Sequence, residues 1–493
     1  MYQKSGCTFF VLPESKCCLL HLAFARYPLY NSLEGEIMPF NRPMHDMLTK
    51  CKGRLRLHVP GHKGQTPFGE EDVLDFDMTE LDMTDDLYHP SDAIKKAQEL
   101  LAASAGAGHS LFLTGGSTAG ILTMLLYAAK PGEMVILPRN AHLSCIHGCI
   151  LADLNPVYVP FEITADGYAY TAADGFLQAI EQYPQAKAVF VTRPDYYGGM
   201  MPLADIAAAA HERGMRLLVD EAHGAHLNWM PDVQSACTAG ADMWVQSAHK
   251  TLPAMTAGAF LHLGKQESVL RARRMLRMVQ TSSPAFYLMK SMDDARAWMD
   301  TYGKKALVEL QNRLSTFRSK LKEIGYQDAH LCWHDLPLTF DETRLVISAP
   351  QGGYALADAL RHLTIDVEMA DDRRIVCVFS VMDGEEIFSR LERALRVVAK
   401  TSAASTFTPN VTHILPKRIM PPRQAALGDV EWVEVEKSVG RVLAASAGLY
   451  PPGIPLVVQG EEIPAEAIEI LLSVPNRNRF GIDSGRVLCV KGL

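Results

Sequence analysis

Short apolar runs alternate with helical patterns between residues 110 and 263, and these runs are apolar throughout instead of at every second position. Strands that are apolar on both faces are typical of a mainly parallel sheet that helices cover on both sides. We therefore predict an α/β major domain built on such a sheet. Its strands are expected at residues 111–114, 134–137, 157–159, 188–192, 217–219, 243–246 and 259–263.

The pattern divides the remaining chain into further units. Helical and strand patterns alternate again from residue 297 to 400, with strands expected at 345–349, 365–369 and 375–379, which indicates a small α/β domain. Residues 401–406 have the composition of a linker, and a separate C-terminal unit follows. We assign residues 38–296 to the major domain, 297–400 to the small domain and 401–493 to the linker and C-terminal domain.

Residues 1–37 form an N-terminal extension. Its two apolar stretches, 8–12 and 17–25, are separated by Glu14, Ser15 and Lys16. A secretory signal has one continuous apolar region followed by a small-residue cleavage site, so the pattern argues against one. We interpret the extension as either a disordered segment or the result of a misplaced start, with Met38 as the natural first residue.

Composition narrows the class of protein. The chain has 493 residues, 48% of them hydrophobic, and a net charge of -8, which indicates a globular protein and argues against nucleic-acid binding. Its ten cysteines include no C-x-x-C pair, which favours a reducing cytoplasm. No uninterrupted apolar run approaches the roughly 20 residues of a membrane span. We expect a cytoplasmic protein that binds neither nucleic acid nor membrane.

Two candidate residues for chemistry stand at the ends of predicted strands. Lys250 lies in the sequence Ser247-Ala248-His249-Lys250, where a hydroxyl and an imidazole accompany an amine suited to a carbonyl-bearing cofactor. Asp220 ends the strand at 217–219. Pyridoxal phosphate (PLP) needs such a buried carboxylate to keep its ring nitrogen protonated.

A third motif, Gly115-Gly116-Ser117-Thr118-Ala119, connects a predicted strand to a helix. Backbone N–H groups at a helix N-terminus, helped by the Ser117 and Thr118 hydroxyls, bind a phosphate dianion. All three motifs fall beyond the carboxyl ends of strands, where ligands bind in parallel sheets. A Gly/Ser turn alone would be a weak signal, but the combination predicts a PLP enzyme.

The three motifs, in this order, resemble PLP-dependent transferases of the aspartate aminotransferase fold (fold type I). More narrowly, the sequence resembles the ornithine/lysine/arginine decarboxylase family. Further matches to this family are the segments HVPGHKG at 58–64, DMTEL at 77–81, RNAH at 139–142 and YPPGIPL at 450–456. The resemblance extends from about Met38 to near the C-terminus, and it implies a short form without the family's N-terminal receiver-like domain.

The resemblance implies a role for each matched residue. His142 is expected to stack on the PLP ring, and Lys250 to hold the cofactor covalently. The expected cofactor-binding residues are Ser117, Thr118, Ala119, His142, Asp220, Ala222, His223, Ser247, His249 and Lys250. The expected catalytic residues are Lys250, His249, Asp220 and His223. His249 or the released Lys250 would return a proton to the substrate's Cα, and an orienting hydrogen bond accounts for His223 equally well.

Substrate contacts are less well defined. The resemblance places His62 and Lys63 at the site entrance and Glu461 near the distal cation of the substrate, although exposed turns explain these residues equally well. The acidic residues between 75 and 86 form either a solvated face or a surface that positions a basic substrate. Two positions depart from the family pattern: Leu143 stands where lysine is common, and Asp195 where threonine is usual.

The sequence therefore predicts PLP-dependent decarboxylation of arginine, lysine or ornithine to CO2 and a polyamine or its precursor. The resemblance implies a homodimer, or a higher homo-oligomer, with shared active sites. The nearest alternative is an aminotransferase or lyase on the same fold. An inactive PLP-binding relative, or a metal-dependent hydrolase, is a more distant one. The hydrolase would use Asp220, Glu221, His223 and His226 but leaves Lys250 unexplained, so we expect no metal.

Overall fold

The computed structural model describes residues 40–52, 71–401, 415–449, 454–474 and 476–492. The N-terminal extension, the loop with His62 and Lys63, most of the predicted linker and residues 450–453 lie outside the described residues.

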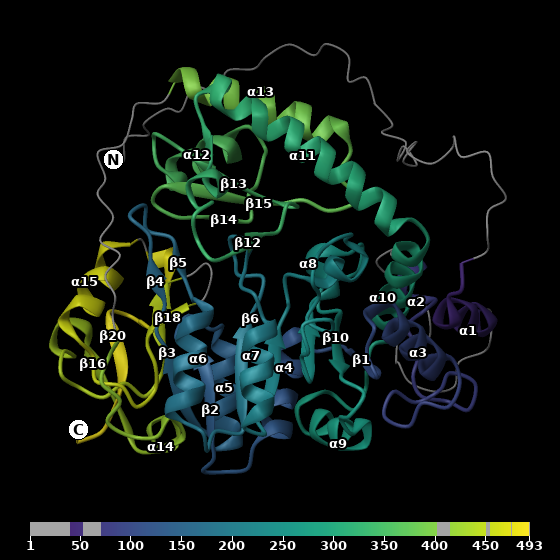
Figure 1. Ribbon diagram of the computed structural model, residues 1–493, viewed down its shortest axis with the longest axis horizontal. Coiled ribbons are helices and arrows are strands. Elements are labelled where there is room, and N and C mark those ends of the chain that lie inside the picture. Colours follow the sequence, from purple (N-terminus) through teal and green to yellow (C-terminus); the bar gives the residue numbers. More distant parts are fainter. Residues whose placement is uncertain (1–39, 53–70, 402–414, 450–453, 475, 493) are drawn as a thin grey trace, which may run out of the picture. The chain divides into compact units, whose positions relative to one another are not determined.

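A seven-stranded sheet forms the centre of the major domain, with the described strands in the order β1-β10-β9-β8-β6-β2-β3 (Figure 1). Every pair is parallel except the two pairs that β10 makes. The strands are β1 (His109–Leu113), β2 (Met134–Pro138), β3 (Asn155–Val159), β6 (Ala188–Thr192), β8 (Arg216–Asp220), β9 (Met243–Gln246) and β10 (Ala259–Leu263). All seven predicted strands are present, and the predicted α/β fold class is confirmed.

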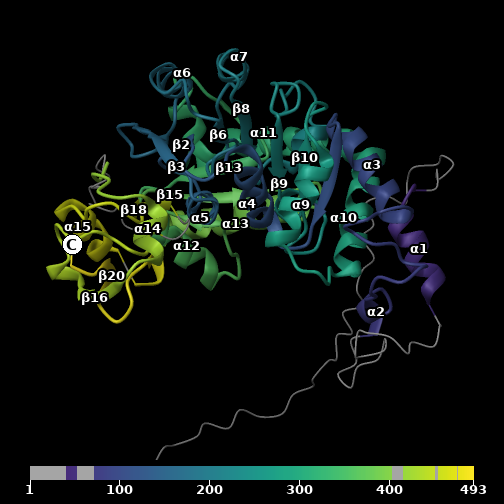
Figure 2. The same cartoon turned by 90° about the horizontal axis from the view of Figure 1, so that it is seen from below.

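Helices cover both faces of this sheet, as Figure 2 shows. One face packs against α4 (Gly116–Ala128), α5 (Leu143–Ala152) and α9 (Val269–Val279). The other packs against α6 (Ala173–Gln182) and α7 (Ala204–Glu212), and near β1 and β10 against α1 (Pro43–Cys51), α3 (Ala93–Ala105) and α10 (Phe286–Trp298). Successive side chains of a strand point to opposite faces. Accordingly Leu218 packs in the first core, and Leu217 and Val219 pack in the second.

Two glycines place the N-terminus of α4 at the strand ends. A Cβ on Gly120 would lie 2.6 Å from Val245 Cγ2 and 2.7 Å from Leu113 Cδ1, so α4 can approach the sheet this closely only with glycine there. Gly116 has φ +72°, a left-handed conformation that favours glycine. The start of α4 therefore turns sharply and lies against β9 and β1.

A four-stranded antiparallel sheet lies in the described part of the small domain, in the order β11-β13-β15-β14. Its elements are β11 (Gln327–Asp328), β13 (Arg344–Ser348), β14 (Met369–Ala370), β15 (Arg374–Val378), α11 (Lys304–Ile324), α12 (Gly353–His362) and α13 (Glu385–Thr401). A π-helical turn, Met299–Gly303, joins α10 to α11, so the helices run on past residue 296. The domain boundaries stay predictions.

The predicted strand at 365–369 is wrong over most of its length. Thr364 has φ +59° and the Ile365 N–H bonds to Leu360 O, so these residues end α12. Ile365 and Val367 are half-buried against the core of the small domain. Loop residues that pack on a core produce the same apolar alternation as a strand, which explains the error.

The C-terminal unit is tied to the major domain through a buried ion pair. Its elements are α14 (Pro422–Leu427), β16 (Val430–Glu434), β17 (Ala447–Leu449), β18 (Ile454–Val457), α15 (Ala465–Ser473), β19 (Arg479–Phe480) and β20 (Arg486–Val490). Arg139, just after β2, donates to Pro455 O at 2.9 Å, Leu456 O at 2.8 Å and Glu461 Oε2 at 2.9 Å. The Val458 N–H also donates to Glu461 Oε2, at 2.9 Å.

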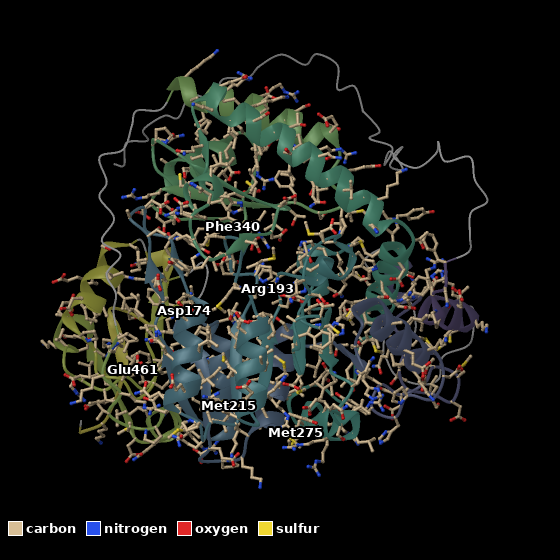
Figure 3. All side chains as sticks on the ribbon, viewed as in Figure 1. Asp174, Arg193, Met215, Met275, Phe340 and Glu461 are labelled. Atoms are coloured by element: carbon tan, nitrogen blue, oxygen red, sulfur yellow. The ribbon has the colours of Figure 1, made fainter. Side chains whose placement is uncertain are left out.

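The expected role of Glu461 at the substrate is therefore wrong. Its carboxylate is buried among the C-terminal elements, where Figure 3 labels it, and its partners are Arg139 and the Val458 N–H. Burial raises the pKa of Glu461, although Arg139 opposes this rise. Glu461 stabilises the docking of the C-terminal unit.

Within the described ranges, no helix has the length and apolar character needed to cross a bilayer.

We predict that Glu461→Leu lowers the free energy of unfolding by about 3–5 kcal/mol, because it leaves the Arg139 guanidinium buried without its counter-charge. Urea unfolding at fixed protein concentration measures the change. Glu466→Gln, at an exposed position of α15, is the matched control and should change the free energy by no more than about 0.5 kcal/mol. Equal effects of the two substitutions would contradict the assignment.

Candidate active site

A cavity opens beyond the carboxyl ends of β6 and β8, where parallel sheets bind their ligands. Six of the predicted residues line it: Ser117, His142, Asp220, Ala222, His223 and Lys250. The sequence motifs therefore converge on one site. The other predicted residues are not in the described lining: Thr118 and Ala119 lie in the first turn of α4, and Ser247 and His249 lie at the start of the short helix 248–251.

Asp220 is the last residue of β8, and its carboxylate is buried on the face of the sheet that α4 and α5 cover. Burial raises the pKa of Asp220, and the neighbouring His142 and Lys250 partly oppose this rise. The Ala222 N–H donates to Asp220 Oδ1 at 3.1 Å. A buried carboxylate of this kind could hold a proton on a ring nitrogen.

Lys250, in the short helix α8 (Ala248–Thr251), faces Asp220 across the cavity. Burial lowers the pKa of Lys250, Arg344 lowers it further, and Asp220 and Glu368 oppose the change. Lys250 Nζ lies 2.9 Å from His223 Nε2. An amine whose pKa is lowered has a larger neutral, nucleophilic fraction at a given pH.

His142 is the N-cap residue of α5. Its Nδ1 accepts from the Ser144 N–H at 3.2 Å and lies 2.8 Å from Ser144 Oγ, which fixes the orientation of the ring. Burial lowers the pKa of His142, with a further contribution from Lys250. A neutral imidazole held at the cavity wall fits the predicted stacking on an aromatic ring.

The polar groups around the start of α4 fit a phosphate. The Gly116 N–H donates to Ala257 O at 2.9 Å, and the N-cap residue Gly115 has no side chain to cap the N–H groups that follow. Thr114 Oγ1, Ser247 Oγ and Thr251 Oγ1 are among the buried hydroxyl oxygens that have no hydrogen-bond partner within the described residues. Buried polar groups are normally satisfied, so orphaned hydroxyls around a helix N-terminus indicate a bound anion.

His249 is directed toward the loop that follows α8. Its Nδ1 donates to the Gly258 carbonyl at 3.0 Å, and its backbone N–H also bonds to Gly258 O. This placement holds α8 against the start of β10. A role of His249 in proton transfer stays a prediction.

Three further residues were not predicted, one that lines the cavity and two that contact its lining. Arg344, the first residue of β13, is buried and its Nη2 lies 3.3 Å from His223 Nδ1. Tyr196 lines the cavity, its ring lies 4.8 Å from the His223 ring, and its hydroxyl donates to Glu368 Oε1 at 2.9 Å. In the sequence, Arg344 is a charged residue at the start of an apolar strand, and Tyr196 is one of two adjacent tyrosines after β6. Neither pattern identifies the residue that the side chain contacts.

Asp195, which replaces the usual threonine, lines the cavity but is occupied locally. Its Oδ1 accepts from the Tyr197 N–H at 2.9 Å and the Gly199 N–H at 2.8 Å, and Tyr168 donates its hydroxyl to Oδ2. Burial raises the pKa of Asp195 to about 6. These hydrogen bonds hold the turn after β6 in place.

The acidic residues before α3 are also engaged locally. Asp85 accepts from the N–H groups of Ser91 and Ile94, and Asp86 accepts from that of Tyr88. They shape the loop into α3, and they are not among the described residues that line the cavity.

The four residues of the hydrolase alternative do not converge. Glu221 lies on the opposite face of the sheet from Asp220, and His226 Nε2 lies 3.2 Å from the buried Asp341 Oδ1. Across the described residues, no group of three or more histidine, cysteine or acidic side chains could hold a metal ion. The geometry thus gives this alternative no support.

A buried polar network crosses five neighbouring strands on the face opposite Asp220. Ser110 Oγ lies 2.7 Å from His262 Nδ1, and His262 Nε2 lies 3.0 Å from Gln246 Oε1. Gln246 Nε2 donates to Glu221 Oε2 at 2.7 Å, and Glu221 lies 3.6 Å from Arg193, which Figure 3 labels. The network holds the ends of β8 and β9 together from behind.

The hydrogen-bond partners in this network determine which of its atoms carry protons. Burial lowers the pKa of His262 to about 3, so the ring is neutral. Asn228 Nδ2 donates to Gln246 Oε1, which identifies that atom as the acceptor for His262 Nε2–H, and His262 Nδ1 then accepts from Ser110. Burial raises the pKa of Glu221 to about 7 although Arg193 opposes this.

The lysine, the strand-end carboxylate and the phosphate-binding turn on a mainly parallel sheet define an α/β enzyme of the PLP-dependent aminotransferase fold. A solved serine palmitoyltransferase of Sphingomonas wittichii has this fold, with a TM-score of 0.51 and 16% identity over 63% of this chain and 77% of that one. Residues 42–351 match the family model of the Orn/Lys/Arg decarboxylase major domain, and 405–477 match its C-terminal domain. The chain belongs to the Orn/Lys/Arg decarboxylase family and is a decarboxylase.

Named relatives agree with this assignment. An uncharacterized protein, YaaO, of Bacillus subtilis (strain 168) is 35% identical over 87% of this chain and 94% of its own length. An arginine decarboxylase of Halalkalibacterium halodurans is 32% identical over 87% and 91%. The solved constitutive lysine decarboxylase of Escherichia coli has a TM-score of 0.77 at 20% identity, over 91% of this chain and 82% of that one. The predicted family is confirmed.

We predict that His262→Leu lowers the free energy of unfolding by about 1–3 kcal/mol, because it leaves the buried Ser110 hydroxyl without its partner. His109→Leu, at an exposed position of the adjacent strand β1, is the matched control and should change it by no more than about 0.5 kcal/mol. The decrease in the free energy of unfolding caused by Ser110→Ala should be smaller in the His262→Leu variant than in the wild-type protein. Additive effects in urea unfolding would argue against the network.

Proposed function

We propose that the protein is a PLP-dependent decarboxylase of a basic L-amino acid, with arginine ahead of lysine and ornithine as the substrate. The arginine decarboxylases among the relatives are 29–32% identical to this chain, whereas the lysine decarboxylases are 20–22% identical. The observation that carries the proposal is the composition of the cavity wall.

Tyrosines backed by carboxylates form one wall of the cavity. Tyr170, Tyr196 and Tyr197 line it. Their hydroxyls donate to Glu162 Oε2 at 2.6 Å, Glu368 Oε1 at 2.9 Å and Asp371 Oδ2 at 2.8 Å, respectively. Aromatic faces attract ammonium and guanidinium groups, and the carboxylates behind them add negative potential. Such a wall suits the distal cation of a basic amino acid.

The chain's own residues supply the binding groups that PLP requires. Lys250 would hold the cofactor covalently, Asp220 would keep a proton on its ring nitrogen, and His142 would lie against its ring. The start of α4, with Ser117 and Ser247, would bind its phosphate. When bound, PLP supplies a conjugated ring that accepts the electrons left by the departing CO2.

A proton must then be returned to the substrate's Cα. Lys250 Nζ lines the cavity and is our candidate donor, whereas His249 is directed at Gly258. His223, which contacts Lys250, would orient its amine.

The same proposal covers the biological setting. We expect a cytoplasmic homodimer or higher homo-oligomer with shared active sites, acting in polyamine biosynthesis. Size measurement by light scattering tests the oligomeric state.

We predict that the purified protein, given PLP and equimolar arginine, lysine and ornithine, releases one dominant amine. Chromatography of the products identifies it, and agmatine is the expected product. Lys250→Ala should abolish the reaction because no other amine is positioned in the described cavity lining. An absence of all three amines would reject the basic-amino-acid assignment.

We predict that Glu368→Gln raises the KM for the basic substrate roughly tenfold, equivalent to about 1.4 kcal/mol of lost binding, with a smaller effect on kcat. Steady-state kinetics measure both constants. Glu386→Gln, at an exposed position of α13, is the matched control and should leave KM unchanged. An unchanged KM in Glu368→Gln would remove this residue from substrate recognition.

A further inference from the structure

Three side chains from separate elements form a line of contacts that ends at the lysine amine. Arg344 belongs to β13, His223 follows β8, and Lys250 belongs to α8. Arg344 Nη2 lies 3.3 Å from His223 Nδ1, and His223 Nε2 lies 2.9 Å from Lys250 Nζ. Arg344 and His223 are only 0% and 7% exposed, so bulk water does not replace these contacts.

The guanidinium decides how His223 is protonated. Arginine stays charged in proteins and can only donate, so His223 Nδ1 must accept from Arg344. A doubly protonated ring would direct N–H groups at two donors and add a third positive charge to a buried site. Consistent with this, burial lowers the pKa of His223 well below its usual value, and Lys250 and Arg344 lower it further.

The neutral ring with an acceptor at Nδ1 carries its proton on Nε2. This N–H is directed at Lys250 Nζ, which can accept it only through the lone pair of a neutral amine. An ammonium group would direct its own N–H against that of the ring. We infer that Arg344, acting through the tautomer of His223, keeps the Lys250 amine in its neutral, nucleophilic form. The inference rests on the proposed role of Lys250.

The charged groups around Lys250 act on its amine in opposite directions. The titratable and charged groups that face the amine are His142, Asp220, His223, Arg344 and Glu368. Asp220 and Glu368 favour the ammonium form, whereas burial and Arg344 favour the neutral amine. Without Arg344, both carboxylates would act on the lysine with no positive charge from β13 to balance them.

The neutral form is the one that can capture the cofactor. Covalent attachment to the PLP aldehyde would need the lone pair of this amine, and the aldehyde oxygen would leave as water with the two amine protons. An ammonium group has no lone pair for this step. Arg344 is therefore a positioning residue that contacts neither reacting atom.

Lys250 reactivity in cofactor-free protein tests the inference. The pH dependence of Lys250 acetylation by acetic anhydride, followed by peptide mass spectrometry, gives the pKa of the amine. Arg344→Met should raise this pKa by about one unit, which makes the neutral fraction roughly tenfold smaller at lower pH. Arg344→Lys should restore most of the change, and Glu368→Gln should shift the pKa downward. An unshifted pKa in folded Arg344→Met would overturn the inference.

The tautomer can be measured without any change at Arg344. Nitrogen-15 NMR of ring-labelled histidine in the cofactor-free wild-type protein, with His223 assigned by its loss in His223→Gln, should show a proton on Nε2 and none on Nδ1. The opposite tautomer, or a doubly protonated ring at pH 7, would overturn the inference even if Arg344→Met fails to fold.

A separate readout distinguishes this inference from the proposed function. Borohydride reduction after incubation with PLP should fix the cofactor to Lys250 and add its mass to that peptide. No mass increase in the wild-type protein would reject the proposed cofactor role. A mass increase together with an unshifted pKa in Arg344→Met would reject only the role of Arg344.

Discussion

The cost of burying charge is the constraint on which the rest of this site depends. Asp220, Lys250, His142 and His223 meet in one cavity, and for all four the dominant effect on the pKa is burial, which favours the neutral form. An isolated ion there would cost several kcal/mol. Groups whose environments oppose their charges in this way are typical of functional sites, because a bound ligand supplies the missing partner. A protonated ring nitrogen beside Asp220 and a phosphate at the start of α4 would do so.

The sheet separates this cavity from a second set of buried polar groups. Asp220 and Ser247 project toward α4 and α5, whereas their sequence neighbours Glu221 and Gln246 project to the other face, since side chains of a strand alternate. Behind the sheet, hydrogen bonds connect Ser110, His262 and Gln246, and Gln246 also bonds to Asn228 and Glu221. In front of the sheet, the Ser247 hydroxyl has no hydrogen-bond partner among the described residues. The hydrogen-bonded network behind the strand ends thus gives the ligand site in front of them a rigid support.

The major domain could be predicted from the sequence because its strands are buried on both faces, so each produced a continuous apolar run. The three ligand motifs could be placed for the same reason, since each ends such a run. The small domain was harder: Ile365 and Val367 pack on its core from a loop and imitate a strand. Glu461 was placed at the substrate, but its partner Arg139 lies 322 residues earlier in the chain. Arg344 and Glu368 were missed because their contacts with His223 and Tyr196 arise only on folding.

These long-range contacts connect substrate recognition to the reactivity of the lysine. Glu368 accepts a hydrogen bond from Tyr196 in the cavity wall and also raises the pKa of Lys250. Under the proposed function, the distal cation of a basic substrate offsets the negative charge of Glu368 when it binds. The upward influence of Glu368 on the Lys250 pKa then weakens, while the downward influence of Arg344 remains. A substrate of the correct charge thus makes the released Lys250 ammonium a stronger acid for returning a proton to Cα, whereas a neutral amino acid of similar shape does not. The charge that gives specificity also changes the state of the lysine.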